Sequence, residues 1–173
     1  MSQNGRNFFF LLEHSVALEN DYDGGLIFYA INGVWQGLVQ QDWYTTNAPN
    51  MVLTTASDNP LAGNYAFSGA DEGGLTGSPG VSAFNIPGVV DGDTINLEFA
   101  LATDCAYGII GWSVLGLHTF ACDDTCGDGY CSETEVPCGI SMACGGVWNV
   151  VSLRCCRSDR DSFARAVISV IIH

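Results

Sequence analysis

Residues 26–39, LIFYAINGVWQGLV, carry the strongest fold signal in the chain. Two runs rich in β-branched and aromatic residues flank the dipeptide Asn32-Gly33. Asn-Gly is a preferred pair for a type I′ turn, in which both central residues take positive φ and the strand twist is matched. The stretch therefore predicts a β-hairpin and favours an all-β fold.

Apolar or alternating runs bounded by Gly, Pro and Asx turns predict further strands on both sides of this hairpin. They lie at 8–18, 51–56, 81–86, 94–101, 106–120, 147–153 and 162–173. In 94–101, apolar residues alternate with polar ones, which indicates a strand with one buried and one solvent-facing side. We expect one domain, residues 1–173, built as a jelly-roll-like β-sandwich.

The segment 122–156 concentrates seven of the eight cysteines, and we expect it to form a disulfide-rich loop inserted into the sandwich. It contains no Cys-x2-Cys pair, which argues against a zinc knuckle, the alternative use of such thiols. Disulfides are typical of an oxidising compartment, so an extracellular, cell-surface or virion-surface location is expected. The expected disulfide cysteines are Cys105, Cys122, Cys126, Cys131, Cys138, Cys144, Cys155 and Cys156, in pairings that the sequence does not select.

The chain is strongly acidic, with 19 Asp and Glu against 5 Lys and Arg and a formal net charge of −14. This balance argues against general binding to nucleic acid or to anionic membranes. The apolar runs are too short to span a bilayer, so no membrane insertion is expected. Four arginines near the end of the sequence, at the exit of the cysteine segment, are expected to contact an acidic partner, including a second copy: Arg154, Arg157, Arg160 and Arg165.

The cysteine segment also offers candidate Ca²⁺ ligands. Asp124, Asp128 and Glu135 match positions 1, 5 and 12 of an EF-hand-like loop, with Gly129 at position 6. Cys126 stands at position 3, where an oxygen ligand is expected, and no helices flank the loop. The CGDGYC core resembles stretches of small cysteine-rich modules of secreted proteins.

Two other acidic turns are candidate cation ligands at the rim of the sandwich. One contains Asp21 and Asp23 beside Glu19, and the other contains Asp91 and Asp93. The sequence from Asn20 to Asp23 resembles the acidic loops of calcium-dependent lectins. The alternative interpretation is ordinary turn chemistry with solvated carboxylates.

Signatures of catalysis are sparse. The histidines His14, His118 and His173 lie outside any HExxH pattern, and no GxSxG occurs. We therefore expect a non-enzymatic structural subunit that self-associates into a multimer, filament or coat. The alternatives are a calcium-dependent carbohydrate-binding module, with Trp43 and Tyr44 stacking on a glycan, and a carboxylate-dependent hydrolase.

Overall fold

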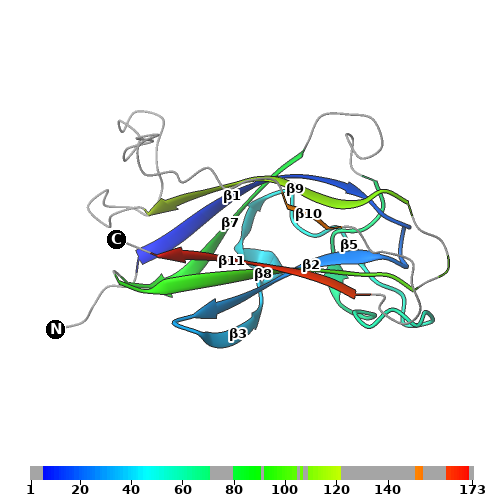
Figure 1. Cartoon of the computed structure of the whole chain (residues 1–173), viewed down its shortest axis with the longest axis horizontal. Helices are drawn as coiled ribbons and strands as arrows, with labels where there is room; N and C mark the ends of the chain where they lie inside the picture. Colours follow the sequence, from blue (N-terminus) through cyan, green and yellow to red (C-terminus); the bar gives the residue numbers. More distant parts are fainter. Residues whose placement is uncertain are drawn as a thin grey trace.

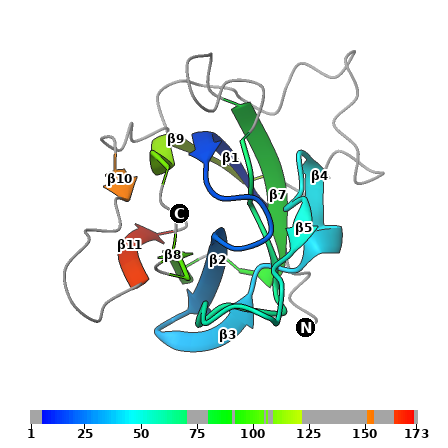
Figure 2. The ribbon, with the colours of Figure 1, turned by 90° about the vertical axis from the view of Figure 1, so that its right-hand side faces the viewer.

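Two antiparallel sheets face each other in this protein (Figures 1 and 2). The computed structural model describes residues 6–70, 80–90, 92–104, 106, 109–121, 151–153 and 163–171. One sheet has the order β10-β9-β1-β7-β4 and the other has the order β11-β8-β2-β3. β5 and β6 form a small ladder of their own. The expected all-β class is confirmed.

The described residues form, in chain order, eleven strands and one short 3₁₀ helix. They are β1 (Arg6–Ala17), β2 (Gly24–Ile31), β3 (Val34–Leu38), η1 (Gln41–Trp43), β4 (Tyr44–Thr46), β5 (Met51–Val52), β6 (Tyr65–Ala66), β7 (Gly80–Val89), β8 (Thr94–Ala102), β9 (Gly111–Ala121), β10 (Val151–Leu153) and β11 (Phe163–Ile171). Within these residues, no helix has the length and apolar character needed to cross a membrane.

The predicted hairpin is confirmed by its backbone geometry. β2 and β3 pair antiparallel, with Ile31 opposite Val34. Asn32 has φ 52° and Gly33 has φ 77°, so both central residues occupy the left-handed region that a type I′ turn requires. The local sequence therefore predicts this connection correctly, and the side chain of Asn32 also ties the turn to β8 by donating to Asp93 and accepting from the amide of Thr94.

The main core fills the space between the two sheets. Trp112 on β9 and Phe99 on β8 come from opposite sheets, and their ring centroids lie 5.7 Å apart. Phe10 on β1 stacks against Phe84 on β7 at 5.2 Å. All four side chains are at most 1% exposed. The Trp112–Phe99 contact joins the two layers, whereas the Phe10–Phe84 stack lies within one sheet and packs its inner face.

The expectation for 94–101 was wrong for one side of the strand. Ile95 and its alternate neighbours face the main core as expected, but Glu98 is only 6% exposed and Ala100 is fully buried. The segment 51–66 covers this outer side and forms a second, smaller core of Leu26, Leu53, Leu61, Ala66, Ala100 and Ala102. Because this segment must wrap over the sheet, only Met51–Val52 of the strand expected at 51–56 is extended.

The sandwich is closed differently along its two sides. On one side β10 and β11, the last strands in the sequence, lie side by side where the edges of the two sheets meet (Figures 1 and 2). On the other side the edges are β4 and β3. β1, in contrast, is central in its sheet, between β7 and β9.

Candidate cation site

The turn between β1 and β2 closes tightly on itself at one end of the sandwich. The backbone amide of Asp23 donates to the carbonyl oxygen of Glu19 at 3.0 Å, and Asp21 takes a left-handed φ of 70°. Asp23 is followed by Gly24, which pairs with Ala102 at the end of β8. Residues just before β2 and just after β8 must therefore lie next to each other.

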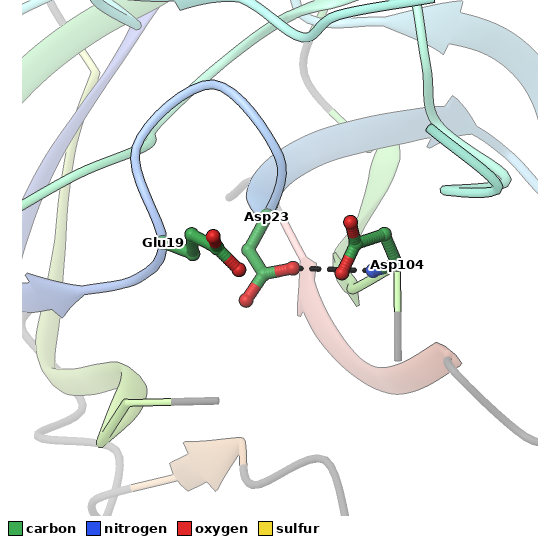
Figure 3. A group of neighbouring side chains, drawn as sticks. All are labelled: Glu19, Asp23 and Asp104. Carbon is green, nitrogen blue, oxygen red and sulfur yellow. Dashed lines mark hydrogen bonds between the residues drawn. The ribbon is translucent and has the colours of Figure 1, made fainter. Parts of the chain in front are cut away.

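Three carboxylates converge at this place (Figure 3). Glu19 and Asp23 come from the turn, and Asp104 follows the end of β8. One ligand oxygen from each lies within 4.8 Å of the others. All three are hard oxygen donors, the type that Ca²⁺ and Mg²⁺ take in proteins.

Asp23 is the buried member of the cluster, with a residue exposure of 1%. Its Oδ1 accepts a hydrogen bond from the backbone amide of Asp104 at 3.2 Å. Its Oδ2 is buried and has no hydrogen-bond partner in the described part of the chain, and the same is true of Oε2 of Glu19. Buried carboxylate oxygens without partners are costly, so these two atoms are the unusual feature of this end of the molecule.

Burial, followed by the negative charges of Asp104 and Glu19, raises the pKa of Asp23 to about 6. The hydrogen bond from the amide of Asp104 acts in the opposite direction. A hydrogen bond to a charged group is worth roughly 1.5–3 kcal/mol. Two carboxylates about 5 Å apart repel by roughly 3 kcal/mol at an effective dielectric constant of about 20. Desolvation is the largest effect, and together with the two repulsions it outweighs the backbone hydrogen bonds that lower the pKa.

Two glycines make room for Asp23 at the start of β2. A Cβ on Gly25 would lie 2.3 Å from Cε3 of Trp112, and a Cβ on Gly24 would lie 2.7 Å from Cδ1 of Leu53. The backbone after Asp23 therefore runs between the indole on one side and the second core on the other. Only glycine permits this approach, so the Asp-Gly-Gly sequence holds the Asp23 backbone in the interior.

Asn59 ties together the two segments that carry the carboxylates. Its Nδ2 donates to the carbonyl oxygen of Tyr22 at 2.6 Å and to that of Ala102 at 3.0 Å. Its Oδ1 accepts from the amide of Leu61 at 2.7 Å, and the residue is 4% exposed. Tyr22 immediately precedes Asp23, so this one amide group sets the spacing between the turn and the end of β8.

Ser68 also holds the β1–β2 turn, through hydrogen bonds to the backbone of Asp21 and Asp23. Its Oγ lies 2.6 Å from the carbonyl oxygen of Asp23 and accepts from the amide of Asp21 at 3.2 Å. Ser68 is itself held by Asn50, whose side chain exchanges two hydrogen bonds of 3.0 Å with the Ser68 backbone. The turn is therefore fixed by side chains as well as by its own backbone.

The structure separates the four acidic residues predicted in the two rim turns. Asp23 lies in the cluster, whereas Asp21 does not. Asp93 accepts from Asn32 Nδ2 at 2.7 Å through Oδ1 and from the amide of Val90 at 2.9 Å through Oδ2, so both oxygens serve the turn before β8. Asp91 lies outside the described residues.

The other predicted site residues are only partly covered. Asp124, Asp128 and Glu135 lie outside the described residues, as do all eight predicted disulfide cysteines and Arg154, Arg157 and Arg160. The backbone of Arg165 is in β11, opposite Ala100. The predictions that rest on these residues remain predictions.

Trp43 and Tyr44, the predicted glycan-stacking pair, pack against the main core. The Trp43 ring lies 5.4 Å from that of Tyr29, and the Tyr44 ring lies 5.1 Å from that of Phe84. Burial also raises the pKa of the Tyr44 hydroxyl. Both rings are therefore engaged in holding β4 and η1 on the sandwich.

A buried histidine and serine lie close enough to suggest catalysis, but their hydrogen bonds run in the wrong direction. Trp112 Nε1 donates to His14 Nδ1 at 3.0 Å, and His14 Nε2 lies 2.7 Å from Ser82 Oγ. Because an indole N–H can only donate, neutral His14 carries its proton on Nε2 and donates to Ser82. Ser82 in turn donates to the carbonyl oxygen of Asn47 at 2.8 Å. A nucleophilic serine needs an imidazole that accepts its proton, so this chain of bonds serves packing.

The sequence alone pointed to the turn that contains Glu19, Asp21 and Asp23 but missed the proximity of Asp104 to Asp23. The available signal was Asp104, an acidic residue soon after the apolar strand β8. This signal becomes informative only once β2 and β8 are known to pair. The fold and the cluster define the molecule as an all-β protein of two facing sheets with three carboxylates gathered at one end. No protein-family model, curated protein or solved structure matches the chain.

Proposed function

We propose that the chain is a non-enzymatic structural subunit that self-associates into a multimer, filament or coat. The observation that carries this proposal is the edge strand β3, on which Val34 is 62% exposed and Trp35 is 52% exposed. In the part of the chain that is described, β3 has a strand partner on one side only. Exposed apolar edge strands pair readily with another chain unless they are covered or charged.

The charge distribution favours a second copy as the partner. No charged residue occurs from Asn32 to Gln41, although the whole chain has a net charge of −14. Two acidic copies approach with least repulsion where each is uncharged. Antiparallel pairing of two β3 strands about a twofold axis would join two four-stranded sheets through backbone hydrogen bonds.

Light scattering coupled to size-exclusion chromatography tests this proposal on the full chain. We expect a concentration-dependent mass above that of the monomer, which Trp35→Lys shifts to the monomer. Val52→Lys is the matched control, because Val52 is 50% exposed but belongs to β5. A wild-type monomer at high concentration, or equal effects of the two substitutions, would contradict the proposal.

The finer fold assignment, a jelly-roll-like sandwich stabilised by disulfides, belongs to the same proposal. Four antiparallel pairs are nested in the sequence: β1 with β9, β2 with β8, β4 with β7 and β5 with β6. Nesting of this kind results when one long hairpin is rolled up, which supports the jelly-roll-like connection of the strands. The disulfides and the extracellular, cell-surface or virion location rest on the cysteine pattern, and alkylation followed by mass spectrometry of the native chain tests the disulfides.

The two alternative functions receive less support from the described residues. A calcium-dependent carbohydrate-binding module was expected to use Trp43 and Tyr44, which pack against the core. A carboxylate-dependent hydrolase needs an acid that its substrate can reach, whereas Asp23 is 1% exposed. Self-association through β3 therefore stands as the proposed function.

A further inference from the structure

We propose that Glu19, Asp23 and Asp104 bind one divalent cation and that the ion they fit best is Ca²⁺. A group of acidic residues is common on protein surfaces and would not support this inference. The second observation is the buried side chain of Asp23, whose Oδ2 has no hydrogen-bond partner among the described residues although Asp23 is 1% exposed. Figure 3 shows this carboxylate between the other two.

A cation would satisfy the atoms that the protein leaves without partners. Oδ2 of Asp23 and Oε2 of Glu19 are both buried, and neither has a partner in the ranges that the structure describes; one oxygen of each carboxylate lies within 4.8 Å of the others. No lysine exists in the chain to balance the charge of the cluster. A divalent ion cancels two of the three negative charges and coordinates the same oxygens, which removes both the repulsion and the unpaired atoms.

The donor set selects the class of ion. All three ligands are carboxylates, with no thiolate or imidazole among them, and such hard oxygen donors favour Ca²⁺ or Mg²⁺ over zinc and copper. Ca²⁺ accepts irregular coordination and both monodentate and bidentate carboxylates, whereas Mg²⁺ demands nearly ideal octahedral geometry. Ligands from a turn and a strand end, held by the fold at fixed spacing, suit the more tolerant ion.

The site is held in place before any ion arrives. Asn59 fixes the turn to the end of β8 through Tyr22 and Ala102, and Ser68 holds the backbone of Asp21 and Asp23. The ion therefore does not have to order these segments, and its binding energy is retained as stability of the folded state. Because Asp23 is buried, the bound ion is structural: it joins the β1–β2 turn to the end of β8.

Titration of the calcium-free full chain with CaCl₂, followed by isothermal calorimetry, tests the assignment. Removal of the central ligand in Asp23→Asn should eliminate one binding event, and Asp104→Asn and Glu19→Gln should weaken the same event. Asp42→Asn, which alters the carboxylate of the exposed helix η1, is the matched control and should bind like wild type. Asp128→Asn, in the EF-hand-like segment, distinguishes the two candidate sites. It should leave unchanged the Ca²⁺-binding event that Asp23→Asn removes.

Thermal unfolding without calcium provides a second readout that does not depend on binding. Asp23→Asn removes a buried charge while keeping the shape of the side chain, so without calcium it should melt above wild type, and calcium should no longer raise its melting temperature. If wild type binds no Ca²⁺, or if the Asp23 and Asp104 variants bind with unchanged stoichiometry and affinity, the assignment is overturned. Because these measurements do not involve Trp35 or oligomer mass, this proposal and that of self-association can fail independently.

Discussion

Asp23 accepts a hydrogen bond from the backbone amide of Asp104, while the carboxylate of Asp104 is one of the two whose negative charge disfavours an ionised Asp23. Asp104 thus stabilises the ionised form of Asp23 through its backbone amide and destabilises that form through its carboxylate. This conflict lies at the meeting point of the β1–β2 turn and β8, and four predictions follow from it and from the packing around it.

Without calcium, stability should increase as the pH falls from 7 towards 4. The pKa of Asp23 is raised from 3.8 to about 6 in the folded state, so between these values the folded chain binds more protons than the unfolded chain. This contribution is complete below pH 3.8, is lost as the pH rises through about 6, and amounts to roughly 3 kcal/mol at about 1.4 kcal/mol per pKa unit.

Urea unfolding of calcium-free protein at a series of pH values measures this contribution. The other carboxylates also titrate, so the informative quantity is the difference between wild type and Asp23→Asn. That difference should shrink as the pH falls below about 6. A difference that does not change with pH would show that Asp23 is ionised in the folded chain throughout this range.

Replacement of Asn59 should weaken calcium binding as well as folding. Asn59→Ala leaves the carbonyl oxygens of Tyr22 and Ala102 without their side-chain donor, which should cost about 2–3 kcal/mol of unfolding free energy. Loss of a group that positions metal ligands typically lowers affinity about 10–100-fold. Calorimetry with CaCl₂ measures the second effect. Asn64→Ala, which loses one 3.0 Å bond in the same loop, is the control and should bind calcium normally.

Gly25→Ala should destabilise the sandwich strongly. The added Cβ would lie 2.3 Å from the indole of Trp112, which is fully buried and cannot move aside without disturbing the core. Overpacking of this kind costs roughly 1–3 kcal/mol or more. In Gly116→Ala the nearest atom, at 3.3 Å, is the end of the flexible Glu13 side chain, so its unfolding free energy by urea titration should change much less.

Trp112→Phe should lower the unfolding free energy by about 2–4 kcal/mol, because it removes both buried volume and the hydrogen bond to His14. Tyr65→Phe is the control and should have an effect within about 0.5 kcal/mol, since Tyr65 is 41% exposed and lies outside β3. Chemical unfolding followed by far-UV circular dichroism compares the two. Equal effects would mean that the indole of Trp112 does not anchor the core.

Local features of the sequence predicted local structure well. Asn32-Gly33 determined the β2–β3 hairpin because turn geometry depends on adjacent residues. The burial of Ala100 on the outer side of β8 could not be predicted, because it depends on the segment 51–66 folding over that side. The carboxylate cluster could not be predicted for the same reason. Asp23 and Asp104 lie close together only because of the register in which Gly24 pairs with Ala102.

The central position of β1 has a consequence for how the chain reaches its fold. Phe10 pairs with Phe84 on one side and with Thr119 on the other, so this strand needs partners that are synthesised much later. Folds dominated by such distant pairings fold slowly. During synthesis the apolar run of β1 therefore stays unpaired and exposed until β7 and β9 have been made. A nascent chain in this state is prone to aggregate unless a chaperone covers it.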